Sequence, residues 1–116
     1  MSGRQRRDTL RALVAWSGEL TQLTAGLAHG AILPESDAVV IRRQDVMNAI
    51  ERFESGDATA LELEEWAETV HTNEDIELDE NDRSLLAQAL FELSTPELFG
   101  NPADVARSLR RRLAAE

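Results

Sequence analysis

The sequence predicts an all-α fold, a small antiparallel bundle of about five helices that forms one domain over residues 1–116. Three observations lead to this prediction. Apolar residues recur in several segments at the i, i+3, i+4, i+7 spacing that lines one face of a helix. Capping residues, glycine or proline separate these segments. The length of 116 residues also suits one domain with a core of its own.

The first helix is expected between Asp8 or Thr9 and about Ala28, after a basic arm of residues 1–7 that we expect to be disordered. Its apolar residues recur at alternating spacings of three and four residues, which is typical of a coiled-coil seam. Such a seam packs either against the domain's own helices or against a second copy in a homodimer. It consists of Leu13, Trp16, Leu20, Leu23 and Leu27.

The chain then continues in a connection over residues 31–42. Ala38–Ile41 is rich in β-branched residues, but one strand alone forms no sheet, so we expect a buried loop there. A second helix is predicted over Arg43–Glu54 and ends before Gly56. Its inner face is formed by Val46, Ala49, Ile50 and Phe53.

A third helix is predicted after Thr59, because Thr59 and Glu62 stand at the spacing of a capping box. Its buried stripe is formed by Leu63, Trp66, Ala67 and Val70. Leu61 points to the opposite side, because each residue turns the helix by about 100°. That opposite side also carries Glu64, Glu65 and Glu68. Like charges at these spacings repel each other, and the helix macrodipole offsets this only near the N-terminus.

Residues 73–82 form an acidic segment with six acidic residues and no basic residue. Ile76 and Leu78 alternate with carboxylates there, which indicates a short extended piece or a loop fixed by two apolar residues. Together with the third helix, this segment supplies the candidate partner-binding residues. They are Glu64, Glu65, Glu68, Glu74, Asp75, Glu77, Asp79 and Glu80.

A fourth helix is expected from Asn81 or Asp82 to Leu93. Leu85 and Phe91 are expected to widen its apolar stripe. The stripe itself repeats the spacing of the third helix and consists of Leu86, Ala89, Leu90 and Leu93.

Pro96 stops the fourth helix and begins one short turn, which Gly100 closes. A last helix then starts with Asn101 as its N-cap and Pro102 in its first turn. Its buried stripe consists of Val105, Leu109 and Leu113. Arginines crowd its C-terminal half, where cations suit the macrodipole, and we expect them to be a solvated face or partners for the acidic segment. They are Arg107, Arg110, Arg111 and Arg112.

Charge is distributed unevenly along the chain, whose formal net charge is −10. Residues 51–97 hold 15 acidic and 2 basic residues, whereas residues 98–116 hold 4 basic and 2 acidic residues. A strongly negative surface disfavours nucleic acid as a partner, because phosphate contacts need lysine or arginine. It favours a basic protein partner and speeds the encounter with it.

The sequence contains no motif for catalysis or for cofactor binding, so we expect a protein that is not an enzyme and has no cofactor. The absence of cysteine excludes disulfides and thiolate metal ligands. His71 stands near Glu74 and Asp75, but their spacing fits no zinc site. A calcium loop that starts at Asp75 would place Glu80 where glycine is required and Leu86 where glutamate is required.

No apolar run reaches the ~18 residues that a membrane-spanning helix needs, so we expect no membrane partner. The basic N-terminus is not followed by the uninterrupted apolar stretch of a secretory signal. We therefore expect the protein in the cytoplasm.

Four pieces of the sequence stand out together, namely Gly56–Asp57, Leu63–Glu68, Glu74–Ile76 and Leu90–Gly100. This stretch of about residues 56–100 resembles a group of small, acidic, mostly helical bacterial proteins that are largely uncharacterised. Some of them look like immunity proteins that neutralise toxins of rival bacteria. The resemblance implies a helical, cytoplasmic binding protein, and it assigns no site residue.

These observations favour a non-catalytic acidic binding protein, such as an immunity- or antitoxin-type inhibitor of a basic, nuclease-type toxin. Its carboxylates would pair with lysine and arginine of the partner or mimic phosphates, and Leu61, Ile76 or Leu78 would add an apolar contact. In a competing interpretation the same carboxylates only keep the surface solvated. The alternative function is a homodimeric structural or regulatory module that uses the seam of the first helix.

Overall fold

The computed structural model describes residues 3–16, 39–73 and 76–115, and this part of the chain is mostly helical. Its α-helices, in chain order, are α1 (Gly3–Ala15), α3 (Arg43–Glu54), α4 (Ala60–Thr72), α5 (Arg83–Ser94), α6 (Pro96–Phe99) and α7 (Pro102–Ala114). Two strands, β1 (Val39–Ile41) and β2 (Ile76–Leu78), and a 3₁₀ turn, η2 (Glu80–Asp82), complete the described elements. The predicted all-α class therefore describes most of this structure, but the prediction did not include the small sheet of β1 and β2.

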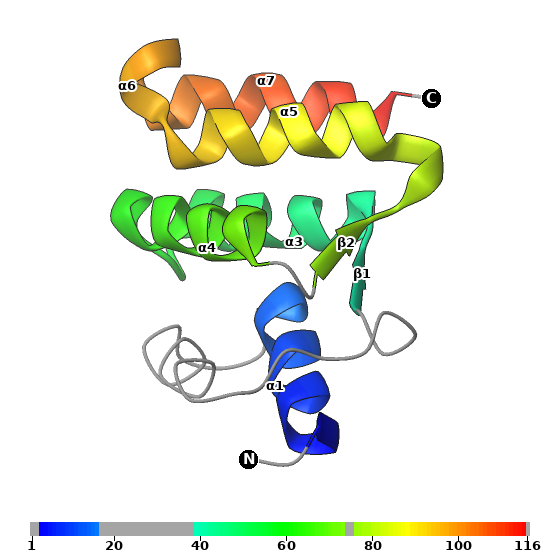
Figure 1. Cartoon of the computed structure of the whole chain (residues 1–116). Helices are drawn as coiled ribbons and strands as arrows, with labels where there is room; N and C mark the ends of the chain where they lie inside the picture. The colour runs from blue at the N-terminus through cyan, green and yellow to red at the C-terminus, as the bar shows by residue number, and fades with distance from the viewer. Residues whose placement is uncertain (1–2, 17–38, 74–75, 116) are drawn as a thin grey trace.

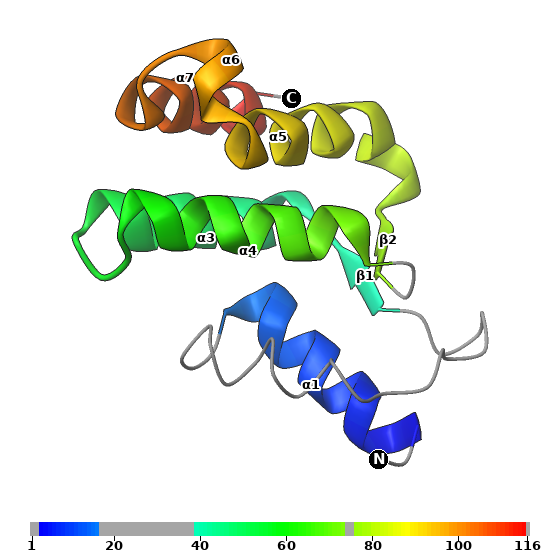
Figure 2. The ribbon, with the colours of Figure 1, turned by 60° about the vertical axis from the view of Figure 1, so that its left-hand side comes forward.

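The long helices lie in layers (Figures 1 and 2). Helices α3 and α4 form one layer, α5 and α7 form a second layer on it, and α1 lies against the other side of the first. The chain doubles back from α3 to α4, from α4 to α5, and again through α6 into α7 (Figure 1). This arrangement places the core between the layers, and it leaves one side of α4 facing outward.

The sheet corrects one prediction. We expected Ala38–Ile41 to be a buried loop, but Val39–Ile41 is a strand that pairs in parallel with Ile76–Leu78, Val39 opposite Ile76 and Ile41 opposite Leu78. The prediction is wrong because the strand's partner lies on the far side of two helices in the sequence. Of the two alternatives expected around Ile76 and Leu78, the short extended piece is confirmed and the loop is not.

Helix α1 also differs from its predicted bounds. It begins at Gly3, so residues 3–15 are helical where a disordered arm was expected up to residue 7. Arginine and glutamine, which fill residues 4–7, have high helix propensity, and this outweighs the position at the chain end. The helix ends at Ala15 instead of near Ala28, because Trp16 has a left-handed backbone with φ of 51°.

The seam predicted for the first helix is described only at its beginning. Leu13 and Trp16 are both buried within the chain's own core. Leu20, Leu23 and Leu27 lie outside the described residues. The two described members of the seam are thus occupied by contacts inside the domain.

The remaining helices follow the sequence closely. Helix α3 has the predicted bounds, and the buried stripes of α3, α4, α5 and α7 are confirmed. Phe53 and Leu85 are partly buried and pack against the core. Phe91, which we expected to widen the stripe of α5, is exposed instead. The confirmed core residues are Val46, Ala49, Ile50, Leu63, Trp66, Ala67, Val70, Leu86, Ala89, Leu90, Leu93, Val105, Leu109 and Leu113.

Hydrogen bonds at the helix ends explain where the helices begin. In the capping box of α4, the Glu62 N–H donates to Thr59 Oγ1 over 3.1 Å, and the Thr59 N–H donates to Glu62 Oε1 over 2.9 Å. Asn101 Oδ1 accepts a hydrogen bond from the Ala103 N–H over 2.8 Å at the start of α7. Both caps were predicted from the sequence. They fix the first residues of α4 and α7 in register with their buried stripes.

Trp66 holds α4 in place from inside the core. Its side chain is 0% exposed, and its Nε1–H donates to the carbonyl oxygen of Leu13 over 2.7 Å. Its ring stacks on Trp16, with the ring centres 5.7 Å apart and the planes 8° from parallel. Arg52 of α3 also lies against Trp16, with its guanidinium 5.3 Å from the centre of the Trp16 ring. Trp66 therefore links α4 directly to the end of α1.

Replacing Trp66 by phenylalanine tests this link. Trp66→Phe removes the indole donor and leaves unfilled volume in the core, so we expect the free energy of unfolding to fall by about 1–3 kcal/mol. Trp16→Phe is the matched control, because it makes the stacked ring smaller and keeps the hydrogen bond from the Trp66 Nε1–H. Urea unfolding followed by circular dichroism measures both. Equal losses in the two variants would contradict the role given to the Trp66 N–H.

Candidate functional site

The outward face of α4 is the candidate site, and its orientation follows from the buried stripe. Since Leu63, Trp66 and Val70 face the core, residues half a turn away must face outward. Leu61 is accordingly 61% exposed, as the sequence predicted. Glu65 and Glu68 are exposed beside it, and Glu64 is partly exposed at the edge of the same face. An apolar side chain thus stands among three carboxylates on one face of a rigid helix.

The three carboxylates of this face, those of Glu64, Glu65 and Glu68, form no ion pair within the part of the chain that the structure describes. Like-charged neighbours at i, i+3 and i, i+4 on a helix cost about 0.2–0.5 kcal/mol per pair. No arginine of the described residues offsets this repulsion. The face is therefore available for a cation from outside.

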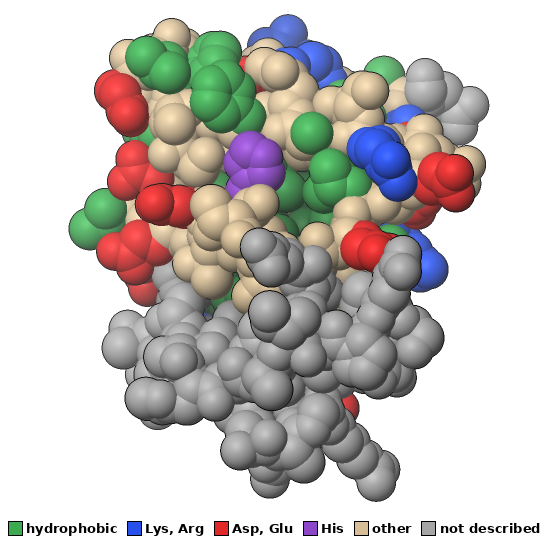
Figure 3. Space-filling view, viewed as in Figure 1, with side chains coloured by type: hydrophobic (Ala, Val, Ile, Leu, Met, Phe, Trp, Pro, Cys, Tyr) green, Lys and Arg blue, Asp and Glu red, His purple; other side chains and the backbone are tan. Residues whose placement is uncertain are grey.

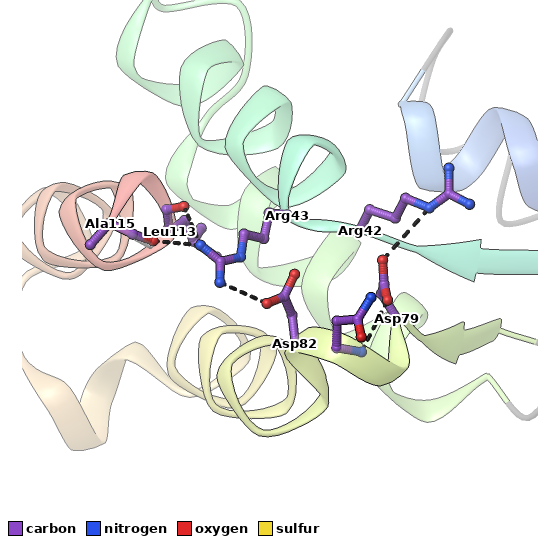
Figure 4. A network of polar contacts seen from close by, with 7 residues as sticks. Arg42, Arg43, Asp79, Asp82, Leu113 and Ala115 are labelled. Carbon is purple, nitrogen blue, oxygen red and sulfur yellow. Dashed lines mark hydrogen bonds and ion pairs between the residues drawn. The ribbon is translucent and has the colours of Figure 1, made fainter.

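The β2–η2 end of the acidic segment has a different arrangement (Figure 4). Asp79 accepts a hydrogen bond from the Asn81 N–H over 3.1 Å, which caps η2, and its other oxygen lies 3.7 Å from Nε of Arg42. Glu77 and Glu80 are exposed nearby without an ion pair among the described residues. Asp79 thus caps the turn and forms an ion pair with Arg42 of this chain. The acids on the outward face of α4 form no such pair among the described residues.

Asp82 belongs to a junction of three elements at the same end of the molecule, in which Arg43 is the common partner. Its Oδ1 lies 2.7 Å from Nη2 of Arg43, and this arginine also donates through Nη1 to the carbonyl oxygens of Leu113 and Ala115 at the end of α7 (Figure 4). The hydrogen bond from Arg43 lowers the pKa of Asp82 below its usual value, against a smaller opposing effect of burial. The junction ties the start of α3 to η2 and to the C-terminus of α7, so we assign Asp82 a structural role.

The predicted set of binding residues therefore falls into two groups. Figure 3 shows acidic side chains gathered over α4 on the left, and others near β2 and η2 on the right with arginines among them. Glu64, Glu65 and Glu68 belong to the first group, and Glu77, Asp79 and Glu80 to the second. Glu74 and Asp75 lie outside the described residues. The group on α4 contains only acids, whereas the other is mixed in charge.

His71 lies on the surface near the C-terminal end of α4 (Figure 3). Its predicted neighbours Glu74 and Asp75 are outside the described residues. Within the described ranges, no group of three or more histidine, aspartate or glutamate side chains is placed to hold a metal ion. Nor does any helix there combine the length and apolar character that crossing a bilayer requires.

The sequence did not single out Glu92, which the structure places in the interior at 7% exposure. Both of its oxygens accept hydrogen bonds from the Arg112 guanidinium, over 2.7 and 2.9 Å, and Gln88 Nε2 adds a third over 2.9 Å. The pKa of Glu92 is lowered mainly by the bonds from Arg112, against the opposing effect of burial. A glutamate beside the buried stripe of α5, together with an arginine in α7, is the signal that could have predicted this pair.

The arginines of α7 were expected to be a solvated face or partners for the acidic segment. The solvated face is confirmed for Arg107, Arg110 and Arg111, which are exposed, whereas Arg112 is partly buried and pairs with Glu92. Arg110 also pairs with Glu54, and Arg107 lies 4.0 Å from Asp104 in its own helix. None of these partners belongs to the acidic segment of residues 73–82. The negative charge of α4 thus remains unneutralised by α7 in the described structure.

No match is found when the chain is compared with models of protein families, with curated proteins and with solved structures. A functional proposal must therefore rest on the residues of this chain alone. The strongest geometric feature is the face of α4, with Leu61 exposed among carboxylates that no arginine of the described residues pairs with.

The Glu92–Arg112 pair predicts a specific response to pH. Because the pKa of Glu92 is lower in the folded state, its stabilising effect is complete well above the ordinary value of 4.5 and is lost as the pH falls through the folded-state pKa. At neutral pH we expect Glu92→Gln to lower the free energy of unfolding by about 1–3 kcal/mol. The difference in unfolding free energy between Glu92→Gln and the unsubstituted protein should shrink as the pH falls from 4.5 through the folded-state pKa of Glu92.

Urea unfolding between neutral and acidic pH measures this difference. Glu97→Gln is the matched control, because Glu97 is exposed on α6 and has no ion pair among the described residues. A gap between Glu92→Gln and the unsubstituted protein that stays constant with pH would contradict the role of the ionised carboxylate.

Proposed function

We propose that the protein is a non-catalytic binding protein that holds a basic partner protein on the outward face of α4. The observation that carries the proposal is the exposure of Leu61 among Glu64, Glu65 and Glu68, none of which is neutralised by an arginine of the described chain. A cation of a partner would relieve the repulsion between these carboxylates. Leu61 would then be covered, which adds the apolar contact that binding sites use as an anchor.

The partner that suits this face is a protein with clustered lysine or arginine, such as a nuclease-type toxin. A nuclease binds phosphates through cationic side chains, and a row of carboxylates on a helix presents negative charge to the same side chains. Binding there would block the nucleic acid, so the protein would act as an immunity- or antitoxin-type inhibitor in the cytoplasm. The net charge of −10 would speed the encounter with such a partner.

The surrounding fold supports this role through rigidity. In this proposal α3, α4, α5 and α7 act as an antiparallel bundle that fixes the α4 face, and Glu77 and Glu80 extend the negative surface toward β2 and η2. Asp79 contributes less, since Arg42 of this chain already lies 3.7 Å from it. In the sequence, Glu74 and Asp75 stand between the two groups of acids. A preformed surface of this kind binds with a lower cost for ordering the backbone.

Charge reversal on α4 tests the proposal. A partner is first captured from the native host with the unsubstituted protein, purified, and titrated by calorimetry. We expect the Glu65→Arg, Glu68→Arg double variant to bind at least roughly tenfold more weakly, because two favourable charge pairs become repulsive. Affinity of the unsubstituted protein should also fall with increasing salt.

The control carries the same change in net charge at another place. Glu51→Arg with Asp57→Arg reverses two exposed acids outside α4, so it separates a local contact from a general effect of charge. If the captured protein binds the α4 variant and the control variant equally, the α4 face is only a solvated surface. Single replacement of Glu77 by arginine shows whether the contact extends to β2.

A further inference from the structure

Three apolar side chains remain exposed where α5 meets α6, and we name Phe91, Leu98 and Phe99 the α5–α6 corner. Leu98 is 67% exposed, and the two phenylalanines are each 39% exposed. The phenylalanine rings contact each other edge to face, with centres 5.5 Å apart. Single exposed apolar residues are ordinary, but exposed apolar side chains that contact one another, as the two phenylalanines do, are a feature of interaction surfaces.

The corner is held in one shape by backbone and side-chain hydrogen bonds. The Thr95 N–H donates to the carbonyl oxygen of Phe91 over 3.1 Å, and the hydroxyl of Thr95 donates to the same oxygen. The Gly100 N–H donates to the carbonyl oxygen of Pro96 over 2.8 Å, where Gly100 has φ of 109°. Helix α6 is thus fixed with its apolar side chains outward, and their exposure is a built feature.

The start of α6 lies near the first turn of α4. A narrow cleft is lined by Ala60 and Leu63 of α4 together with Leu93 of α5 and Pro96 of α6. The cleft thus meets the first turn of α4 on the side of Leu63, whereas Leu61 of the same turn is exposed on the other side. Figure 3 shows apolar side chains over α6 at the upper left, with acidic side chains beside and below them. Apolar and acidic side chains thus gather on the same side of the molecule.

We propose that the α5–α6 corner is the docking surface for an amphipathic basic helix of the partner protein. The inference rests on the proposed function, and it names the part of the partner that the site takes. Apolar side chains of that helix would cover Leu98 and Phe99, while its lysines and arginines would face Glu65 and Glu68 of α4. Charge complementarity selects this occupant, since the acids next to the corner repel an acidic segment.

A helix fits this surface better than an extended strand does. The corner is made by side chains from the ends of helices, and it offers no open strand edge with which a partner backbone could pair. The described sheet lies at the other end of the molecule (Figures 1 and 2). A helix satisfies its own backbone hydrogen bonds and binds through side chains alone, which is what the corner provides.

Two synthetic peptides test the docking surface on the full-length protein. One is an amphipathic helical peptide with lysine on one face and leucine and phenylalanine on the other. Its companion has the same lysines, with glutamine in place of every apolar residue. We expect the amphipathic peptide to bind roughly tenfold more tightly than its companion, because only it can cover the corner. Equal affinity, or no binding of the amphipathic peptide, would overturn the inference.

Variants then locate the contact. Leu98→Ser should reduce binding of the amphipathic peptide toward that of its companion, and Leu98→Ser with Phe99→Ser should complete the loss. Val40→Ser is the matched control, because Val40 is 40% exposed on β1, far from α6. Circular dichroism confirms that each variant is folded. A peptide affinity that Leu98→Ser leaves unchanged would overturn the docking surface.

The result separates this inference from the proposed function. If Glu65→Arg with Glu68→Arg weakens both peptides while Leu98→Ser weakens neither, the acidic face stands and the corner fails. If Leu98→Ser weakens the amphipathic peptide while the charge reversal has no effect, the corner stands as an apolar surface and both the proposed function and the basic character of its occupant fail.

Two other occupants of the corner give distinct results. Phosphatidylcholine vesicles that bind the unsubstituted protein, but not Leu98→Ser, would show that the corner meets a lipid surface. A dimer in sedimentation that Leu98→Ser dissociates would show that the corner meets a second copy. Either result would overturn the assignment to a basic helix, whereas a monomer that leaves the vesicles unbound supports it.

Discussion

The burial of Trp66 is the constraint on which the rest of the structure depends. The indole is fully enclosed, donates a hydrogen bond to the end of α1, and stacks on Trp16. A helix anchored by such a side chain cannot rotate about its axis without exposing it. Leu61 and the carboxylates of α4 are consequently turned outward. The orientation of the candidate site is therefore a consequence of core packing.

Internal ion pairs determine which acids remain for a partner. Arginines of α3 and α7 neutralise Asp82, Glu54 and Glu92, each at a junction between elements. Each of these acids accepts a hydrogen bond from its arginine, and each bond joins two elements of the fold. In the described structure, none of these arginines pairs with an acid of α4. Acidic residues of the same type thus either pair with an arginine of this chain or remain without an ion pair among the described residues, and only their location in the fold separates the two groups.

The sequence was sufficient wherever local rules decide the structure. The spacing of Leu63, Trp66 and Val70 predicted the buried side of α4, and the Thr59–Glu62 capping box predicted its start. The exposure of Leu61 followed from the same helical geometry. These features depend on residues within a few positions of one another, so periodicity and capping are enough to find them.

Predictions failed where distant segments meet. The pairing of β1 with β2 joins strands on either side of α3 and α4, and neither strand is informative alone. Trp16, which has a left-handed backbone, stacks on Trp66, a residue far along the chain. Phe91 matches an apolar stripe by spacing, yet it meets Phe99 on the surface because α6 turns back at Pro96. The acids that pair with an arginine could not be told from the others before the arginines were located in the fold.

The central claim is that the outward face of α4 and the adjoining corner form one contact surface for a basic protein. Methyl cross-saturation in a complex with the captured partner tests it most directly, because it reports which side chains of this chain lie against the other protein. The account predicts strong saturation transfer to the methyl groups of Leu61 and Leu98 and none to those of Val40. Transfer to Val40 with Leu61 and Leu98 unaffected would contradict it.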